Sequence, residues 1–175
     1  TKDKKNPVSY SIENGTLTLK EAGNTGASYY INVDISFLQA ALSSKNIEDY
    51  TKESSKYENY VTLYLPKDKL VSSAKIYLGY GDFYVKNATF DTTNIKLDDG
   101  DFDANTLTAN SGKLTFSYGD CDLQKASLGN ISLTSKDGDL TVNELTLSGK
   151  TKIALSYGDA EITLNDSTKK VSGFD

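Results

Sequence analysis

Carboxylates are the side chains of this 175-residue sequence with the most evident capacity for chemistry. They surround Gly100 and return at intervals along the chain, as Asp82, Asp98, Asp99, Asp101, Asp103, Asp120, Asp122 and Asp139. Clustered acids could bind a hard cation such as Ca²⁺, or serve as paired catalytic carboxylates in polysaccharide cleavage. The chain has no His or Arg to act as a strong base, however, and the acids recur periodically instead of gathering in one segment. A solvated acidic face is therefore the simpler interpretation, and we expect no catalytic residue and no metal site beyond weak surface Ca²⁺.

A second pattern is a three-residue motif that ends in Gly-Asp and occurs five times. Its glycines lie 19 residues apart, with a last step of 20, and the residue before each glycine alternates between two types: Tyr80, Asp99, Tyr118, Asp137 and Tyr157. Tyr and Asp side by side on a rigid surface could stack against, and hydrogen-bond to, a polymer such as a glycan or a peptide. The alternative is that each Tyr ring packs over its neighbouring glycine. The five residues are thus a candidate interaction surface.

The Gly-Asp pairs have a structural explanation. Glycine adopts positive φ without steric cost and can turn a strand or hold a bulge, while the following Asp can accept hydrogen bonds from nearby backbone N–H groups. We therefore expect ten structural corner residues: Gly81, Asp82, Gly100, Asp101, Gly119, Asp120, Gly138, Asp139, Gly158 and Asp159.

Self-similarity at a period near 20 residues is typical of a solenoid, in which each repeat buries its apolar face against its neighbours. Each repeat carries pairs of apolar residues separated by one polar or small residue, which is the pattern of a strand with one buried face. Three such pairs per repeat predict three short strands per coil. The fold class is therefore all-β: a single-stranded parallel β-solenoid, either β-helix or β-roll, with about 19 residues per coil.

Two inward positions are unusual. Ser135 places a hydroxyl in an otherwise apolar column, where it would need a hydrogen-bond partner. Cys121, the single cysteine, also falls in an inward column, where a thiol behaves as a small hydrophobe. With no His to activate it, we expect no nucleophilic role for Cys121.

The sequence predicts one domain with three parts. Residues 1–73 form irregular N-terminal strands that cap the solenoid and carry an inserted excursion, residues 74–164 form five regular coils, and residues 165–175 form a C-terminal tail or cap. Asn14-Gly15 lies between alternating segments and predicts a type I′ hairpin. Apolar residues at helical spacing predict a short helix between about Leu38 and Tyr50.

Composition narrows the partners and the location. The net charge of −5 and pI near 4.8 argue against nucleic acid and against anionic membrane surfaces, because both select basic patches. No apolar run reaches the roughly 18 residues of a membrane helix. The chain has no Met, so it is expected to be a processed or truncated piece, and any export signal or membrane anchor would precede Thr1.

One segment carries a family resemblance. The strand from Tyr60 to Pro66, which reads YVTLYLP, is followed by AKIYLGYGD at 74–82 and by the later Gly-Asp coils. This combination resembles a bacterial family of β-strand-repeat domains of unknown function that carry an adhesin label, over roughly residues 8–164. The resemblance implies a β-solenoid ectodomain at the cell surface, often tethered by an N-terminal membrane segment, and it supplies no catalytic residue.

Two functions remain open at this stage. The first is a non-catalytic extracytoplasmic scaffold that binds another protein or a cell-wall glycan through its Tyr and Asp residues. The second is a carbohydrate-active β-helix enzyme, either a polysaccharide lyase or a hydrolase. Neither requires a cofactor that the sequence could identify.

Overall fold

The computed structural model describes residues 8–21, 29–34 and 69–165, and all of its regular elements are β-strands. Eleven strands form one continuous sheet. Their bounds are β1 Val8–Glu13, β2 Thr16–Glu21, β3 Tyr29–Asp34, β4 Leu70–Leu78, β5 Phe83–Val85, β6 Ala88–Leu97, β7 Phe102–Tyr118, β8 Cys121–Asp137, β9 Leu140–Leu147, β10 Lys152–Tyr157 and β11 Ala160–Leu164. The described part of the chain contains no helix that is long and apolar enough to cross a membrane.

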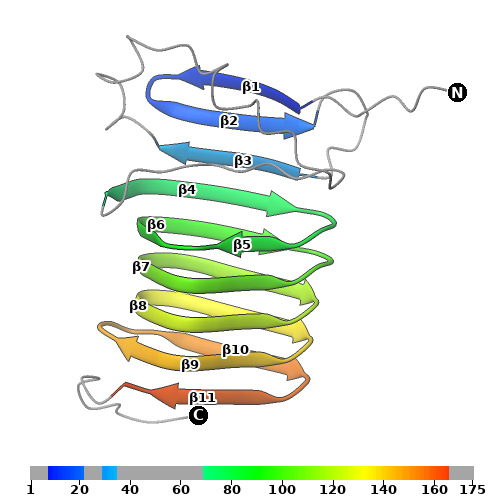
Figure 1. The fold of residues 1–175 in the computed structure, drawn as a ribbon, viewed down its shortest axis with the longest axis vertical. Helices are drawn as coiled ribbons and strands as arrows, with labels where there is room; N and C mark the ends of the chain where they lie inside the picture. Colours follow the sequence, from blue (N-terminus) through cyan, green and yellow to red (C-terminus); the bar gives the residue numbers. More distant parts are fainter. Residues whose placement is uncertain (1–7, 22–28, 35–68, 166–175) are drawn as a thin grey trace, which may run out of the picture.

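The strands from β4 onward stack as a parallel solenoid (Figure 1). β4 pairs with β6, β6 with β7, β7 with β8, and β8 with both β9 and β10, always in parallel. The register joins each residue to its equivalent in the next repeat, as in Leu114 with Leu133. This confirms the parallel β-solenoid of about five turns.

Each coil is a flattened loop with two runs of strand rather than three short ones. Figure 1 shows β9 in front and β10 behind, joined by a bend, and the chain then turns again into β11. β7 and β8 each continue for 17 residues through both runs. The prediction of three strands per coil is wrong because apolar pairs can follow one another along a bent, unbroken strand. The bend in β7 lies at Gly112, whose φ is +128°.

The N-terminal strands are all antiparallel. The sequence predicted this for the hairpin around Asn14-Gly15 but not for the two pairings of β3. β1 and β2 form a hairpin, β3 pairs with β2, and β3 joins the solenoid by pairing antiparallel with β4. Asn14 and Gly15 connect the hairpin with φ values of 50° and 77°, and positive φ at both positions confirms the type I′ turn. The helix predicted near 38–50, and the predicted tail apart from Asn165, lie outside the described residues.

The core is a set of stacked side-chain columns inside the coils. Equivalent residues such as Ile95, Leu114 and Leu133 are fully buried, as a close-packed interior requires. In the β7 coil the rings of Phe102 and Phe116 stack across the interior with centroids 5.1 Å apart. The equivalent positions in the β8 coil are the small residues Cys121 and Ser135. A large pair next to a small pair keeps the core volume compensated along the stack.

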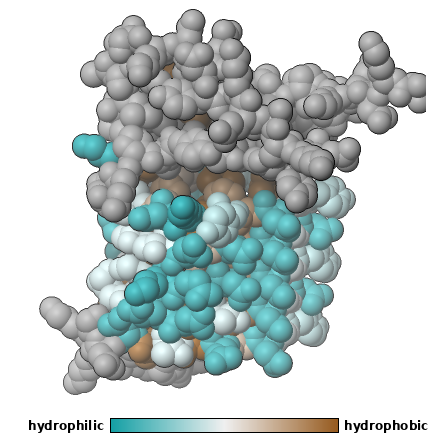
Figure 2. Space-filling view, viewed as in Figure 1, coloured by the Kyte–Doolittle hydropathy of each residue, from teal (hydrophilic) through white to brown (hydrophobic). Residues whose placement is uncertain are grey.

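The apolar columns continue into the last described coil but are not covered there. Ile162 and Leu164 of β11 are exposed, whereas their equivalents Val142 and Leu145 in β9 are buried. β11 ends the strand order of the sheet. Inward-facing residues are therefore buried only where a coil has neighbours on both sides. In Figure 2 the visible face of the stack is largely hydrophilic, and hydrophobic surface shows near its two ends.

Candidate interaction surface

The Gly-Asp corners form one end of every coil, the bends drawn at the right of Figure 1. Their glycines have φ between +103° and +132°, a conformation that other residues rarely adopt. Stacking adds a second constraint. A Cβ atom on Gly119 would lie 2.4 Å from the carbonyl oxygen of Gly100, and one on Gly138 would lie 2.1 Å from that of Gly119. The sequence therefore needs glycine here both for the turn and for the close approach of successive coils.

The aspartates after these glycines form a hydrogen-bonded ladder. Oδ1 of Asp82 accepts from the backbone N–H of Asp101 at 3.0 Å, and Oδ1 of Asp101 accepts from that of Asp120 at 2.9 Å. The ladder continues in the same way: Oδ1 of Asp120 accepts from the N–H of Asp139, and Oδ1 of Asp139 accepts from that of Asp159, both at 2.8 Å. The neighbouring N–H groups point the other way: those of Gly100 and Phe102 donate to carbonyls of the following coil. Successive N–H groups of a strand point alternately to its two neighbours, so the Asp amide faces the preceding coil, and there a carboxylate accepts its hydrogen bond.

The residues before the glycines form a separate exposed column, the Tyr/Asp surface: Tyr80, Asp99, Tyr118, Asp137 and Tyr157. Asp137 pairs in register with Tyr118 on one side and Tyr157 on the other. Asp99 lies between the first two tyrosines, because Gly81 donates to its carbonyl and Gly100 donates to that of Tyr118. The structure therefore brings all five predicted residues into one line along the solenoid.

Most of each tyrosine in this column is accessible to solvent. Tyr80 and Tyr157 are 75% exposed and Tyr118 is 61% exposed. Gly81 and Gly158, beside the two most exposed tyrosines, are exposed as well. The alternative in which each ring covers its glycine would have buried these two glycines, whereas Gly119, beside Tyr118, is only partly exposed. At Tyr80 and Tyr157 the ring therefore does not cover its glycine.

A hollow of about 460 Å³ lies beside the C-terminal half of the Tyr/Asp surface. Tyr118, Asp137 and Tyr157 contribute to its lining from the column itself. The remaining lining residues each precede a residue of the Tyr/Asp surface by one position in the sequence: Asp98, Ser117, Lys136 and Ser156. Two aromatic rings, two hydroxyl groups, two carboxylates and one ammonium group therefore surround an open surface depression.

Asp98 is held by its own neighbours. Its carboxylate forms an ion pair with Lys96 at 2.7 Å and accepts a hydrogen bond from the Tyr77 hydroxyl at 2.8 Å. The hydrogen bond from Lys96 is the main reason that the pKa of Asp98 lies below its ordinary value, and burial opposes this effect. The Lys96 ammonium also lies 5.0 Å from the centroid of the Tyr77 ring. Asp98 thus lines the hollow, but Lys96 already neutralises its charge.

The carboxylates that follow the corner lie apart from Asp98. Asp103 and Asp122 lie in register on β7 and β8, on the far side of the corner from Asp98. Burial raises the pKa of Asp103, and the charges of Asp122, Asp101 and Asp82 add to this. No group of three or more acidic, His or Cys side chains among the described residues could hold a metal ion.

Cys121 occupies an inward position of the same coil and is fully buried. Burial raises the pKa of its thiol far above the ordinary value of 9.0. A thiol that stays protonated is a poor nucleophile, and its surroundings give it a packing role.

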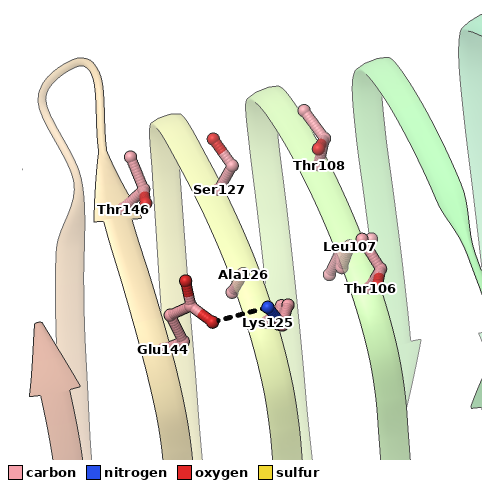
Figure 3. A pocket seen from close by; sticks show the side chains of 8 residues that line it. All are labelled: Thr106, Leu107, Thr108, Lys125, Ala126, Ser127, Glu144 and Thr146. Carbon is pink, nitrogen blue, oxygen red and sulfur yellow. Dashed lines mark ion pairs between the residues drawn. The ribbon is translucent and has the colours of Figure 1, made fainter. Parts of the chain in front are cut away.

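A second, smaller hollow of about 100 Å³ lies over the run of strand that follows the corners. Figure 3 shows Lys125 and Glu144 on neighbouring coils, paired across it at 2.9 Å. Thr108, Ser127 and Thr146 form a column of hydroxyls beside the pair. The hydrogen bond from Lys125 lowers the pKa of Glu144. Apart from this ion pair, the hollow offers only threonine, serine and small apolar groups.

Asp98 was predicted from the sequence without its partners, and the Lys125–Glu144 pair was not predicted. Both contacts carry a signal that periodicity makes visible. Lys125 and Glu144 occupy the same position of successive repeats, so their opposite charges must be neighbours. Asp98 and Lys96 are two residues apart on one strand end, which places both side chains on the same face.

A protein-family model described as Toastrack DUF4097 matches residues 1–173. The chain belongs to this family. Toastrack DUF4097 is a domain family of unknown function, so the match agrees with the resemblance to a β-repeat domain without supporting the adhesin label. Comparison with curated proteins and with solved structures found no match for the chain. Membership of this family therefore does not identify the function.

Proposed function

We propose that this Toastrack domain is a non-catalytic extracytoplasmic scaffold that binds an elongated protein or cell-wall polymer along its Tyr/Asp surface. The observation that carries the proposal is the exposure of three tyrosines in a single column of a rigid stack, with one Asp between each pair. Exposed aromatic residues that a fold does not use for packing often mark binding sites. A column along the axis suits a polymer better than a compact ligand.

The environment of the carboxylates favours binding over catalysis. Glycoside cleavage needs two carboxyl groups facing one substrate bond, one of them with a raised pKa. Four ladder aspartates each accept a backbone hydrogen bond through Oδ1, and Asp98 is engaged by Lys96 and Tyr77. Asp103 has a raised pKa, but it and its register neighbour Asp122 are both only partly exposed, and neither contributes to the two hollows described above. The enzyme hypothesis is therefore the weaker one.

The proposed location is the bacterial cell surface, with a membrane anchor upstream of Thr1. It is supported by the family resemblance seen in the sequence. We propose no cofactor and no nucleic-acid partner. An adhesive role would be one form of this scaffold function.

The test compares binding to purified bacterial cell walls and to a glycan array for the wild-type domain and two variants. Tyr118→Ala removes the central ring of the Tyr/Asp surface and should abolish most of the binding. Tyr84→Ala is the matched control, because Tyr84 is 56% exposed and lies outside the column. Equal binding by both variants would refute a role for this surface. Release of cleaved sugar from any glycan would instead support the enzyme.

A further inference from the structure

The repeat distance of the Tyr/Asp surface restricts what can bind along it. Adjacent coils are about 4.8 Å apart, so tyrosines on every second coil are about 9.6 Å apart. A polyproline II helix has three residues per turn and a rise of about 3.1 Å per residue, so one of its faces repeats every ~9.3 Å. An extended β-strand presents one face about every 6.7 Å and falls out of register with the tyrosines. The spacing therefore fits a peptide in the polyproline II conformation.

The charges on this surface indicate that the partner carries positive charge. Asp99 and Asp137 are exposed, and in the described part of the chain neither carboxylate forms an ion pair; the two ion pairs found there involve Asp98 and Glu144. Asp99 and Asp137 lie two coils apart, so such a carboxylate occurs once per ~9.6 Å, which corresponds to once per three residues of a polyproline II ligand. One cationic side chain per turn of the ligand would pair with each of them. A neutral glycan would leave this regular charge unused.

The hollow beside Asp137 could accommodate part of such a peptide. Tyr118 and Tyr157 bound it, and the hydroxyls of Ser117 and Ser156 line it. Proline rings dock between aromatic side chains in known modes of polyproline recognition, and the ligand's free carbonyl groups accept hydrogen bonds from nearby donors. The exposed Ser156 hydroxyl and the Lys136 ammonium are such donors. The Ser117 hydroxyl is buried and already donates to Oδ1 of Asp98 at 3.5 Å.

We infer that the Tyr/Asp surface binds a proline-rich, lysine-bearing peptide segment in the polyproline II conformation, laid parallel to the solenoid axis. Prolines three residues apart contact successive tyrosines, and the cationic side chains between them pair with Asp99 and Asp137. The inference rests on the proposed function, because it names the partner class of the same surface. From Tyr80 to Tyr157 the surface spans four coil steps, about 19 Å, which corresponds to roughly six residues of the ligand.

The test measures fluorescence anisotropy of a labelled (Pro-Pro-Lys)₄ peptide titrated with the domain. Binding is expected to weaken about five- to tenfold in Tyr118→Ala and in Asp137→Asn, and to weaken with added salt. Tyr84→Ala should bind like the wild type. Thermal melting of each variant establishes that it is folded, which is expected because all three positions are exposed.

Three further probes separate the outcomes. (Pro-Pro-Glu)₄ keeps the conformation and reverses the charge, and it should not bind. (Gly-Ser-Lys)₄ keeps the charge without the conformation; if it binds as tightly as (Pro-Pro-Lys)₄, the surface reads charge alone and the inference is overturned. Chitohexaose supplies a neutral glycan. If chitohexaose binds through Tyr118 while (Pro-Pro-Lys)₄ does not, the inference fails and the proposed function stands. If binding of every probe is indifferent to Tyr118, both fail.

Discussion

Oδ1 of Asp120 accepts a hydrogen bond from the backbone N–H of Asp139, 2.8 Å away on the following coil. The same bond recurs at four successive corners, always from the side chain of one coil to the amide of the next. The ladder explains why Asp follows Gly so regularly. The N–H of the Asp points to the preceding coil, while the N–H groups of the residues on either side point to the following coil, and the carboxylate of the preceding coil accepts it.

Loss of one carboxylate in this ladder should therefore destabilise the fold modestly. Asp120→Ala leaves the Asp139 amide without its acceptor and should lower the free energy of unfolding by about 0.5–1.5 kcal/mol. Asp122→Ala is the control, since Asp122 lies outside the ladder and next to the like charge of Asp103; it should cost less than about 0.5 kcal/mol. Urea titration of both variants measures the difference. Equal losses would show that the ladder bonds add nothing to stability.

Glycine at an internal corner should be far less replaceable than glycine at the first corner. Gly119→Ala faces both a φ of +119° and a contact of 2.4 Å with a backbone carbonyl, while Gly81→Ala faces a φ of +103° with nothing within 4 Å. Gly81→Ala should cost about 1–3 kcal/mol from backbone strain alone. Gly119→Ala should cost clearly more or prevent folding. Thermal melting of the two proteins separates strain from steric overlap, and similar melting temperatures would contradict the close stacking of the corners.

The sequence predicted those features of the fold that the repeat itself determines. Equivalence between residues such as Leu114 and Leu133 follows from the period, and it gives the parallel register, the inward columns and the Tyr/Asp line. The path of the chain within one coil does not follow from it. Apolar pairs around Gly112 fit a bent continuous strand as well as two separate strands, so the flattened, two-run coil was not foreseen.

The antiparallel pairings of β3 and the contacts of Asp98 were missed for a different reason. β1–β3 lie outside the repeat, so no column ties Ile31 to its partner Ile76. The Lys96–Asp98 pair depends on side-chain conformations at one strand end, and a single sequence offers many possible lysine partners for each aspartate. Periodicity constrains neighbours along the stack, whereas contacts within a coil depend on its shape.

The buried hydroxyl of Ser135 should be a site where stability can be gained. Ser135 is fully buried, and its Oγ atom has no hydrogen-bond partner. A buried polar group without a partner costs about 1–3 kcal/mol, so Ser135→Ala should raise the melting temperature by a few degrees. Ser132→Ala, on the same strand but partly exposed, should change it little. A lower melting temperature in Ser135→Ala would mean that the hydroxyl has a role in the core.

Calcium should leave the stability of the domain nearly unchanged. The ladder aspartates already accept backbone hydrogen bonds through Oδ1, and a calcium ion needs roughly six to eight oxygen ligands converging on one point. Millimolar Ca²⁺ should therefore shift the melting temperature by less than about 1 °C, measured against the same protein in EDTA. A rise of several degrees would show binding to the folded state, and the aspartate columns would then have to be reinterpreted as metal ligands.

The ion pair of Asp98 with Lys96 should make part of the stability depend on pH. The pKa of Asp98 lies below its ordinary value of 3.8, chiefly because of the hydrogen bond from Lys96. A carboxyl with a lowered pKa in the folded state stabilises the fold above its unfolded pKa, and this contribution is lost as the pH falls through the folded value. Because Asp98 is partly exposed, the contribution should be at most about 1 kcal/mol.

A double-mutant cycle with Asp98→Asn and Lys96→Gln isolates this contribution. The coupling energy from urea titrations should be present from pH 7 down to about pH 5 and should decrease steadily from about pH 4 to pH 2. High salt should reduce it at neutral pH, because the pair is accessible to solvent. A coupling energy that stays constant down to pH 2 would show that the two side chains interact through packing against Tyr77 and not through charge.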